Sequence, residues 1–343
     1  MRRAALARIG SGAAALLLVV ALMGLLAGPA AADSAGTATA TTPPPQAAQP
    51  AARANVKLYL GGAFSVSRAA VTVPGRTVQV AGIVRPYVPG QLVYVRAFSG
   101  GRVILAGHYR LKPSRHKVYG AFTANVRSPG AGTVTVVVLH AATTGIERFV
   151  AHSSFAVLGE SIGFGSTGRF VQLIQQRLAA LHFYIPQTGV YDAGTGLALD
   201  AYHRLLRWGT YQTLDGRTVS SLLDGRGAFP VHYGGDGRHA EGELTLQLLA
   251  LIDGSRVTTI YPISSGKPST PTILGRFHVY SRVPGYLPDG MYFSNFFYGG
   301  YAIHGYNPAP DYPASHGCMR LPIVDAISAF NWLQMGDAVD VYY

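Results

Sequence analysis

The most informative stretch of this chain is Ser315-His316-Gly317-Cys318-Met319-Arg320, preceded by Ile303-His304-Gly305. Cys318 is the only cysteine in 343 residues, so it cannot form a disulfide within the chain. A thiol is a good nucleophile only as the thiolate, and at an ordinary pKa of about 8.5 only a few per cent is ionised at pH 7. A nearby imidazole raises that fraction and can later return the proton to a leaving group.

Two histidines are candidates for that imidazole. His304 lies fourteen residues before Cys318, and His316 lies two residues before it. Residues two apart on a strand share a face, so we expect His316 and Cys318 to point the same way, with His304 arriving from a neighbouring strand. Gly317 lets the backbone approach a substrate, and the N–H groups around Gly317 and Cys318 are candidate donors to an oxyanion. The pattern predicts acyl transfer with Cys318 as the nucleophile.

Two other interpretations of Cys318 are open at this point. A lone cysteine is often a small buried apolar residue. A zinc site built from His304, His316 and Cys318, with one open position, is the other alternative. No carboxylate fits the general-base pattern of zinc peptidases, so we expect no metal and no cofactor.

The same residues resemble the L,D-transpeptidase (YkuD-type) catalytic domain. Ser264 to Thr272, with Gly275 and Phe277, resembles the segment that precedes the active-site strand in that family. The resemblance implies a mostly β catalytic domain at residues 238–343 that cleaves the L,D bond of a peptidoglycan tetrapeptide stem. Cys318 would take the acyl group as a thioester and release the terminal D-alanine.

Three activities are compatible with this resemblance. Attack on the thioester by the side-chain amine of a second stem gives a 3→3 crosslink, and attack by water makes the enzyme an L,D-carboxypeptidase. The third alternative is a catalytically inactive wall-binding scaffold. Carbapenems resemble the family's acyl donor, so they are the expected inhibitors, beside stem peptides and glycan as partners.

The resemblance also implies residue roles. His304 would be the general base, held in its tautomer by the carbonyl of Gly305, while His316 would shape the site and support the oxyanion hole. Arg320 would either orient a substrate carboxylate or support the loop. Ser315 and Tyr292 are further candidates for substrate binding; Tyr292 belongs to an aromatic run that forms either a substrate-covering loop or a hairpin core.

The N-terminus has the design of a secretory signal over residues 1–32. Three arginines precede an apolar stretch centred on Ala13 to Leu26, and Ala30-Ala31-Ala32 offers small residues for cleavage. The rival is an uncleaved anchor, since Ile9 to Ala32 is long enough to span a bilayer. In both cases we expect an extracytoplasmic protein: secreted, wall-associated, or tethered to the membrane by this segment alone.

The formal net charge is +12, and +9 without the three N-terminal arginines. A basic chain favours anionic surroundings such as an acidic wall polymer. The basic residues are scattered without a run, so the charge indicates no particular site, and we expect no nucleic-acid partner.

The rest of the chain divides by composition and periodicity. With 42 Gly, 21 Pro and only 13% charged residues, it suits turn-rich β domains. Residues 33–55 are rich in Ala, Thr and Pro and predict an extended linker. Residues 56–158 alternate in short strands such as Thr77 to Val84 and Thr133 to Leu139, which predicts an immunoglobulin-like β-sandwich acting as a spacer.

Residues 161–226 change to a helical period. One apolar stripe runs through Val171, Ile174, Leu178 and Leu181, a second through Leu197, Ala201 and Leu205, and Asp192 stands where an N-cap is expected. This segment resembles the small three-helix peptidoglycan-binding domain. Tyr202-His203 stands where that family usually has Phe-Gln, so a helical spacer is the alternative.

The C-terminal part returns to a strand period. Leu244 to Ile252 and Val257 to Ile263 predict a hairpin around Asp253-Gly254. Ile323, Ile327 and Phe330 predict the inner face of one helix, and Ala338 to Tyr342 a last strand.

Overall fold

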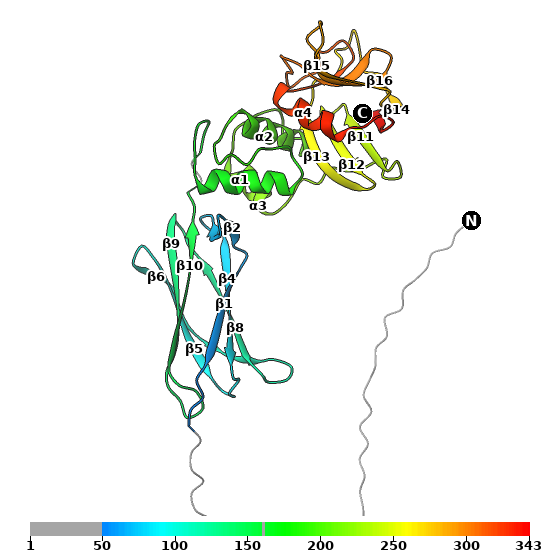
Figure 1. The fold of residues 1–343 in the computed structure, drawn as a ribbon. Coiled ribbons are helices and arrows are strands. Elements are labelled where there is room, and N and C mark those ends of the chain that lie inside the picture. The colour runs from blue at the N-terminus through cyan, green and yellow to red at the C-terminus, as the bar shows by residue number, and fades with distance from the viewer. Residues whose placement is uncertain (1–49, 160–161) are drawn as a thin grey trace, which may run out of the picture. The chain divides into compact units, whose positions relative to one another are not determined.

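The computed structural model describes residues 50–159 and 162–343 (Figure 1). The expected signal segment and most of the expected linker lie outside these residues. Within them, no helix is long and apolar enough to cross a bilayer. The fold is mainly β, as the sequence predicts.

The N-terminal part is a sandwich of two sheets. One sheet has the order β1(Asn55–Gly61), β4(Thr77–Arg85), β8(Gly120–Arg127), β7(Lys112–Pro113). The other has the order β2(Phe64–Val66), β3(Ala69–Thr72), β10(Phe149–Val157), β9(Gly132–His140), β5(Leu92–Ser99), β6(Arg102–Arg110). Alternate residues of both sheets form one core, because successive side chains of a strand point to opposite faces. This arrangement is compatible with the expected immunoglobulin-like sandwich.

Three helices follow, α1(Arg169–Ala180), α2(Ala193–Leu205) and α3(Gly216–Leu223). Asp192 caps α2 by accepting a hydrogen bond from the Thr195 N–H at 2.9 Å, as predicted. The stripe predicted for α2 is partly wrong: Leu197 and Leu205 are only half-buried, while Leu199 and Tyr202 are fully buried. The reason is that α2 is covered by both α1 and the next sheet, so its buried surface is wider than one stripe.

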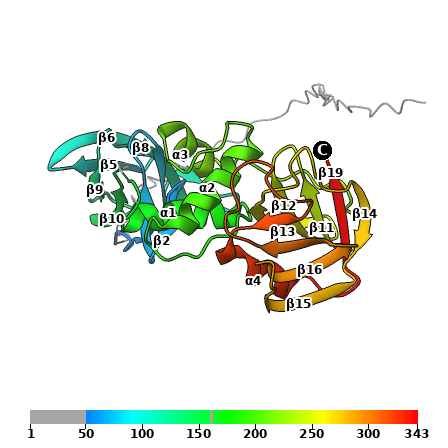
Figure 2. The same ribbon diagram turned by 90° about the horizontal axis from the view of Figure 1, so that it is seen from above.

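The C-terminal part contains two sheets (Figure 2). The five-stranded sheet has the order β13(Arg256–Pro262), β12(Leu248–Asp253), β11(Arg238–Glu243), β19(Ala338–Tyr342), β14(Gly275–His278). The four-stranded sheet has the order β15(Ser281–Tyr286), β16(Tyr292–Tyr298), β17(Tyr301–Gly305), β18(Met319–Leu321). The helix α4(Ile323–Trp332) contacts β16 and β17. The predicted last strand is confirmed, and it lies inside its sheet between β11 and β14.

Two local predictions for this part are wrong. The strand β12 begins at Leu248 rather than Leu244, because residues 244–247 form a turn. The helix α4 exists, but its inner face is Ala326 and Ala329 and not Ile327, which is 43% exposed. Small side chains are needed there because α4 packs closely on β17. Even a Cβ added to Gly305 of β17 would lie only 2.6 Å from the Cβ of Ala326.

The helices and the C-terminal sheets share a hydrophobic core. Apolar side chains of α1 and α2 cluster with Leu248, Ile252 and Ile260 of β12 and β13. The chain after α1 adds backbone bonds: Ile260 N–H donates to the His182 carbonyl at 2.7 Å, and Tyr184 N–H donates to the Ile260 carbonyl at 3.0 Å. Residues 162–226 therefore pack as part of the same body as the C-terminal sheets.

Candidate active site

Strand pairing brings Cys318 close to the strand that carries His304. The strands β17 and β18 are parallel, with His304 opposite Arg320 and Ile303 opposite Met319. Side chains that are opposite each other in a sheet point to the same face, and residues two apart on a strand also share a face. Cys318 lies in the bend directly before β18, so this pairing brings it close to β17, the strand that carries His304.

The ring of His304 is held in one tautomer. It is 2% exposed, and its Nδ1 lies 2.9 Å from the carbonyl oxygen of Gly305. A carbonyl only accepts, so Nδ1 carries the proton and Nε2 is an acceptor. Burial lowers the pKa of His304 to about 4, and the Gly305 bond opposes that shift only in part. At neutral pH the ring is an uncharged base.

The thiol of Cys318 lies against the backbone of the turn before β17 and of β17 itself. Its Sγ is 3.5 Å from the carbonyl oxygen of Gly300. Burial raises the pKa of Cys318, while the backbone of Ala302 and the charge of Arg320 act in the opposite direction. Both shifts favour the uncharged forms, the thiol of Cys318 and the imidazole of His304.

His316 does not have the position expected from a strand period. The strand β18 begins only at Met319, so His316 lies in the bend before it. Its exposed ring accepts a hydrogen bond at Nε2 from Nζ of Lys267, at 3.3 Å. Lys267 was not singled out from the sequence, because nothing local connects residues 267 and 316.

Ser315 and Gly317 shape the loop that holds the thiol. The buried hydroxyl of Ser315 donates to the Cys318 carbonyl at 2.6 Å and accepts from the Gly317 N–H at 3.0 Å. Gly317 has a φ of +124°, and a Cβ there would meet the ring of Tyr301 at 2.4 Å. Only glycine fits this position, because the backbone is in a region that side chains disfavour and the ring leaves no space.

Arg320 is opposite His304 in the sheet, whereas Tyr292 is opposite the next residue, Gly305. The guanidinium of Arg320 stacks 4.0 Å above the ring of Tyr306, and Nη1 donates to the Ala314 carbonyl at 3.4 Å. These contacts match the loop-supporting alternative for Arg320, since both partners belong to the loop before the thiol. Tyr292 is opposite Gly305 in the sheet, and its ring lies 4.3 Å from that of Tyr286 within the hairpin β15–β16.

Comparison with known proteins identifies this part of the chain. Residues 239–341 match the family model of the L,D-transpeptidase catalytic domain, YkuD. The chain carries an L,D-transpeptidase catalytic domain. Every residue of the site described above falls inside the matched range.

Solved structures of several L,D-transpeptidases are similar to this chain. One comes from Xylanimonas cellulosilytica, is 29% identical, covers 54% of this chain and 98% of its own, and has a TM-score of 0.48. A second, from Mycobacterium smegmatis, is 13% identical over 84% of this chain and 100% of its own, with a TM-score of 0.28. A third is the Enterococcus faecium catalytic domain acylated by ertapenem, 25% identical over 31% of this chain and 97% of its own, with a TM-score of 0.27. No curated protein matches the chain.

A hydrogen-bonded path links the helices to the nucleophile loop of the L,D-transpeptidase domain. Arg204 of α2 is buried, pairs with Asp200, and donates to the carbonyls of Gln247 and Ile263 at 3.0 and 3.1 Å. The Gln247 side chain donates to Ser265 Oγ at 2.7 Å and accepts from the Ser265 N–H at 2.8 Å. The Ser265 carbonyl in turn accepts the N–H groups of Ala314 and Ser315, each at 2.9 Å.

The sequence did not predict this hydrogen-bonded path. It joins residues 200 to 315, and only the resemblance of Ser264 to Thr272 to the family's segment pointed to part of it. The available signal was Arg204 four residues after Asp200 on a predicted helix, a spacing at which two opposite charges can pair.

The family match begins at residue 239, after the three helices. Tyr202 and His203, where the sequence departs from the three-helix wall-binding pattern, are both fully buried. His203 uses both ring nitrogens: Nδ1 lies 2.8 Å from the Tyr211 carbonyl and Nε2 lies 2.9 Å from Thr218 Oγ1. These two residues are core side chains here and not an exposed glycan site.

A metal site is the remaining alternative for the L,D-transpeptidase domain. In residues 50–159 and 162–343, no group of three or more His, Cys, Asp or Glu side chains is placed to hold a metal ion. The ring of His316 accepts a hydrogen bond from Lys267, so the three residues of the zinc alternative do not converge.

Proposed function

We propose that this protein is an extracytoplasmic peptidoglycan L,D-transpeptidase that forms 3→3 crosslinks through a thioester on Cys318. The observation that supports it best is the pairing of β17 and β18, because Cys318 directly precedes the strand that pairs with that of the tautomer-fixed His304. The matched catalytic domain supports the substrate class, a peptidoglycan stem peptide.

Acylation begins with the stem's L,D peptide carbonyl placed beside Cys318. Because the pKa of the thiol is raised and that of His304 is lowered, we expect the proton to move from Sγ to Nε2 as the sulfur attacks the carbonyl carbon. The C–N bond then breaks, and the imidazolium returns the proton to the leaving amine of D-alanine. The acyl group remains on sulfur as a thioester.

The second half-reaction transfers the acyl group. The side-chain amine of a neighbouring stem attacks the thioester carbonyl, loses a proton to His304, and forms the new amide bond. The sulfur leaves and recovers a proton, which restores the starting thiol. With water in place of the amine, the same steps give tripeptide stems, the L,D-carboxypeptidase reaction.

Backbone donors would stabilise the tetrahedral oxyanion. The Gly317 N–H is engaged by the Ser315 hydroxyl, whereas the Cys318 N–H has no partner among the described residues. The Cys318 N–H is therefore the better placed of the two candidate donors. In this proposal Ser315, His316 and Arg320 hold the loop, whereas Tyr292 packs beside Gly305 on the face that α4 covers and does not contact the substrate.

The test is a reaction of the purified protein with a disaccharide-tetrapeptide, followed by mass spectrometry of the products. The expected products are 3→3 dimers and free D-alanine, with none from Cys318→Ala. Tripeptide monomers without dimers would replace the crosslinking proposal by carboxypeptidase activity. A folded, reduced protein that forms neither product would support the inactive wall-binding scaffold.

A further inference from the structure

The positive charge of the chain is concentrated in the β-sandwich. Residues 50–159 contain thirteen Lys and Arg and one acidic residue, Glu147, whereas residues 162–343 contain twelve Lys and Arg and thirteen Asp and Glu. The sandwich alone therefore has a formal charge of +12, as large as that of the whole chain. Like charges repel within a compact domain and lower its stability, so this concentration indicates an anionic partner.

Few of these basic side chains have an acidic partner within the protein. Arg53 pairs with Glu147 at 3.8 Å, and Arg76 pairs with Asp224 at 2.8 Å. The other eleven form no ion pair with residues 50–159 or 162–343. Their charges are therefore available to a partner.

Three of these eleven meet on the outer face of the four-stranded sheet of the sandwich. Lys57 of β1 is opposite Ile83 of β4, and both Ile83 and Lys112 of β7 are paired with Ala121 of β8. Neighbouring strands are about 4.8 Å apart, so the backbones of the two lysines lie about 14 Å apart in one row. Arg85 lies two residues beyond Ile83 on the same face. All three basic side chains are exposed, and strand pairing gathers them although they are far apart in sequence.

The turn after β7 adds two more basic side chains beside this face. It is closed by a hydrogen bond from the Ser114 N–H to the Tyr119 carbonyl at 2.9 Å. The guanidinium of Arg85 lies 5.4 Å from the centre of the Tyr119 ring, so the turn is next to the row of cations. Arg115 and Lys117 of this turn are exposed. The basic patch consists of Lys57, Arg85, Lys112, Arg115 and Lys117.

The basic patch contains a small hollow. Its volume is about 70 Å³, and it is lined by Asn55, Lys57, Tyr59, Ile83 and Arg85. Four of these five side chains carry hydrogen-bond donors, two of them charged, and none is acidic. A hollow of this size suits one anionic group of a longer molecule and not a whole ligand.

We propose that the basic patch binds a flexible acidic polymer of the cell wall. One anionic group enters the hollow between Lys57 and Arg85, and the groups that follow it along the polymer contact Lys112 and the turn. The proposal adds a binding activity to the sandwich, beyond catalysis at Cys318. Only the choice of a wall polymer among polyanions rests on the proposed function.

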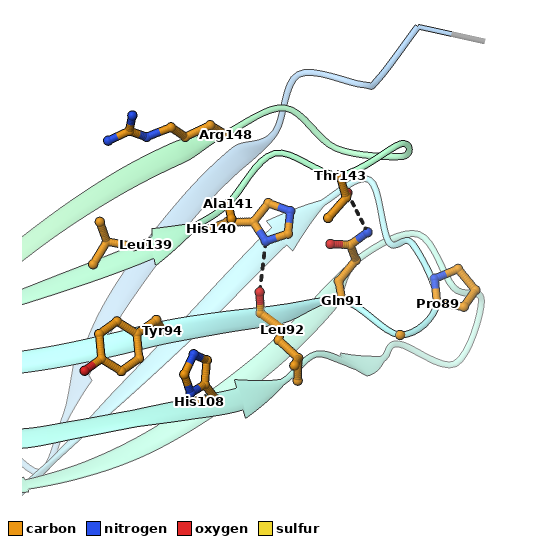
Figure 3. Close-up of a pocket in the computed structure, with 11 residues that line it drawn as sticks. Pro89, Gln91, Leu92, Tyr94, His108, Leu139, His140, Ala141, Thr143 and Arg148 are labelled. Carbon is orange, nitrogen blue, oxygen red and sulfur yellow. Dashed lines mark hydrogen bonds between the residues drawn. The ribbon is translucent and has the colours of Figure 1, made fainter. Parts of the chain in front are cut away.

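A flat lipid surface fits less well, because basic side chains also face outward on the other sheet of the sandwich. Val93 and Val95 of β5 are buried in the core, so Arg96, which alternates with them, points away from it. Figure 3 shows one end of this sheet, where His108 and Arg148 line a pocket that has no acidic side chain. A bilayer contacts one side of a domain, whereas a flexible polymer can follow both.

The test is calorimetric titration of the purified full chain with poly(glycerol phosphate), a flexible polymer with one negative charge per repeat. Saturable binding is expected at about 50 mM salt and should weaken strongly at about 200 mM, because bound counterions are released. The triple change Lys57→Gln, Arg85→Gln and Lys112→Gln should weaken binding roughly tenfold or more and make it less dependent on salt.

A matched control removes the same charge outside the sandwich. It combines Arg169→Gln, Arg226→Gln and Arg256→Gln, all at exposed positions, and should bind like the wild type. A second patch variant, Arg115→Gln with Lys117→Gln, changes only the turn and should also weaken binding.

Three results would overturn the proposal: no saturable binding at the lower salt concentration, an equal loss of affinity in the triple patch variant and its control, or a patch variant that loses affinity for vesicles of anionic lipid and not for the polymer. Acylation of Cys318 by a carbapenem is measured on the same samples and should be equal in all of them. A wild type that binds the polymer but is not acylated would refute the proposed function and leave the basic patch standing.

Discussion

At the scale of the residue, His304 determines how acylation depends on pH. Its pKa is lowered to about 4, mainly by burial. For a histidine with an ordinary pKa near 6.5, the neutral fraction falls about eightfold between pH 7 and pH 5.5, whereas His304 stays neutral. We predict that the rate of Cys318 acylation changes less than twofold over this interval, measured by intact-protein mass spectrometry.

The two histidines serve as controls for each other. His304→Ala should slow acylation by at least roughly a hundredfold at every pH, since a positioned base contributes about that much. His316→Ala should keep the flat profile with a smaller loss, because its ring contacts Lys267. An eightfold fall in the wild type toward pH 5.5, or a larger loss in His316→Ala, would reassign the base.

Asp325 is a second buried ionisable residue, at the start of α4. It is 3% exposed, and burial raises its pKa to about 7 from 3.8. The folded state then keeps a proton that the unfolded state releases, so stability decreases as pH rises from about 4 to about 7 and stays low above that.

We predict that Asp325→Asn removes this decrease. At pH 8 the free energy of unfolding should rise by a few kcal/mol, on the order of the shift in pKa, and the dependence on pH should flatten. Thermal melts at pH 5 and pH 8 measure it, with Asp253→Asn at the exposed end of β12 as control. Equal melts of wild type and Asp325→Asn at both pH values would refute a buried, protonated Asp325.

Single residues with a local signature were predictable. Asp192 was confirmed, because an N-cap precedes its helix directly. Cys318 and His304 were selected because a thiol and an imidazole at a family spacing have a recognisable chemistry, and their catalytic roles stay predictions. Ser315 was selected for substrate contact, but its hydroxyl has two partners within its own loop. Lys267 contacts His316, which is 49 residues away, and Asp325 is buried by the fold; no local pattern contains either feature.

At the scale of the element, α2 positions the nucleophile loop through Arg204. The double change Asp200→Asn with Arg204→Met removes both members of the buried ion pair, so no unpaired charge remains. Gln247 and Ile263 then lose their donor, and the segment that holds Ser265 is released. We predict a folded protein whose acylation rate falls roughly tenfold or more, since small displacements of a reacting group are costly.

The measurement is the acylation rate of the double variant, compared with that of a control variant at another arginine of the helices. Arg177→Met removes a comparable arginine that donates to Leu222 within the helices and touches no part of the loop. It should leave the acylation rate unchanged. If both variants acylate at the wild-type rate while the double variant remains folded, the path from α2 to the loop has no role in positioning.

Strands and helices were predicted better than their faces. The sandwich strands alternate between core and solvent, so their period is visible in sequence. The faces of α2 and α4 were misjudged because each depends on the packing partner: α2 is covered on several sides, and α4 meets β17 where only small side chains fit. The period of the apolar residues identifies a helix or strand, but the element that packs against it determines which surface is buried.

At the scale of the whole molecule, the helices and the L,D-transpeptidase domain share one core. The change from a helical to a strand period in the sequence predicted two separate domains. That change could not reveal that Leu248, Ile252 and Ile260 pack against α1 and α2. Large exposed apolar patches lead to aggregation. We predict that residues 238–343 alone are insoluble or loosely packed, whereas residues 162–343 fold and acylate.

Size-exclusion chromatography and thermal circular dichroism of the two fragments test this. The shorter fragment should elute as aggregate or melt without cooperativity. A monodisperse, cooperative 238–343 fragment that acylates at the full-length rate would show that the helices are a separable module.

The central claim is that Cys318 is an acyl-accepting nucleophile in an L,D-transpeptidase site. The most direct measurement is intact-protein mass spectrometry of the purified chain after reaction with a carbapenem, beside Cys318→Ala. A single adduct on the wild type and none on the variant is the predicted result. No adduct on a folded wild type whose thiol is shown to be reduced, or an equal adduct on Cys318→Ala, would contradict the account.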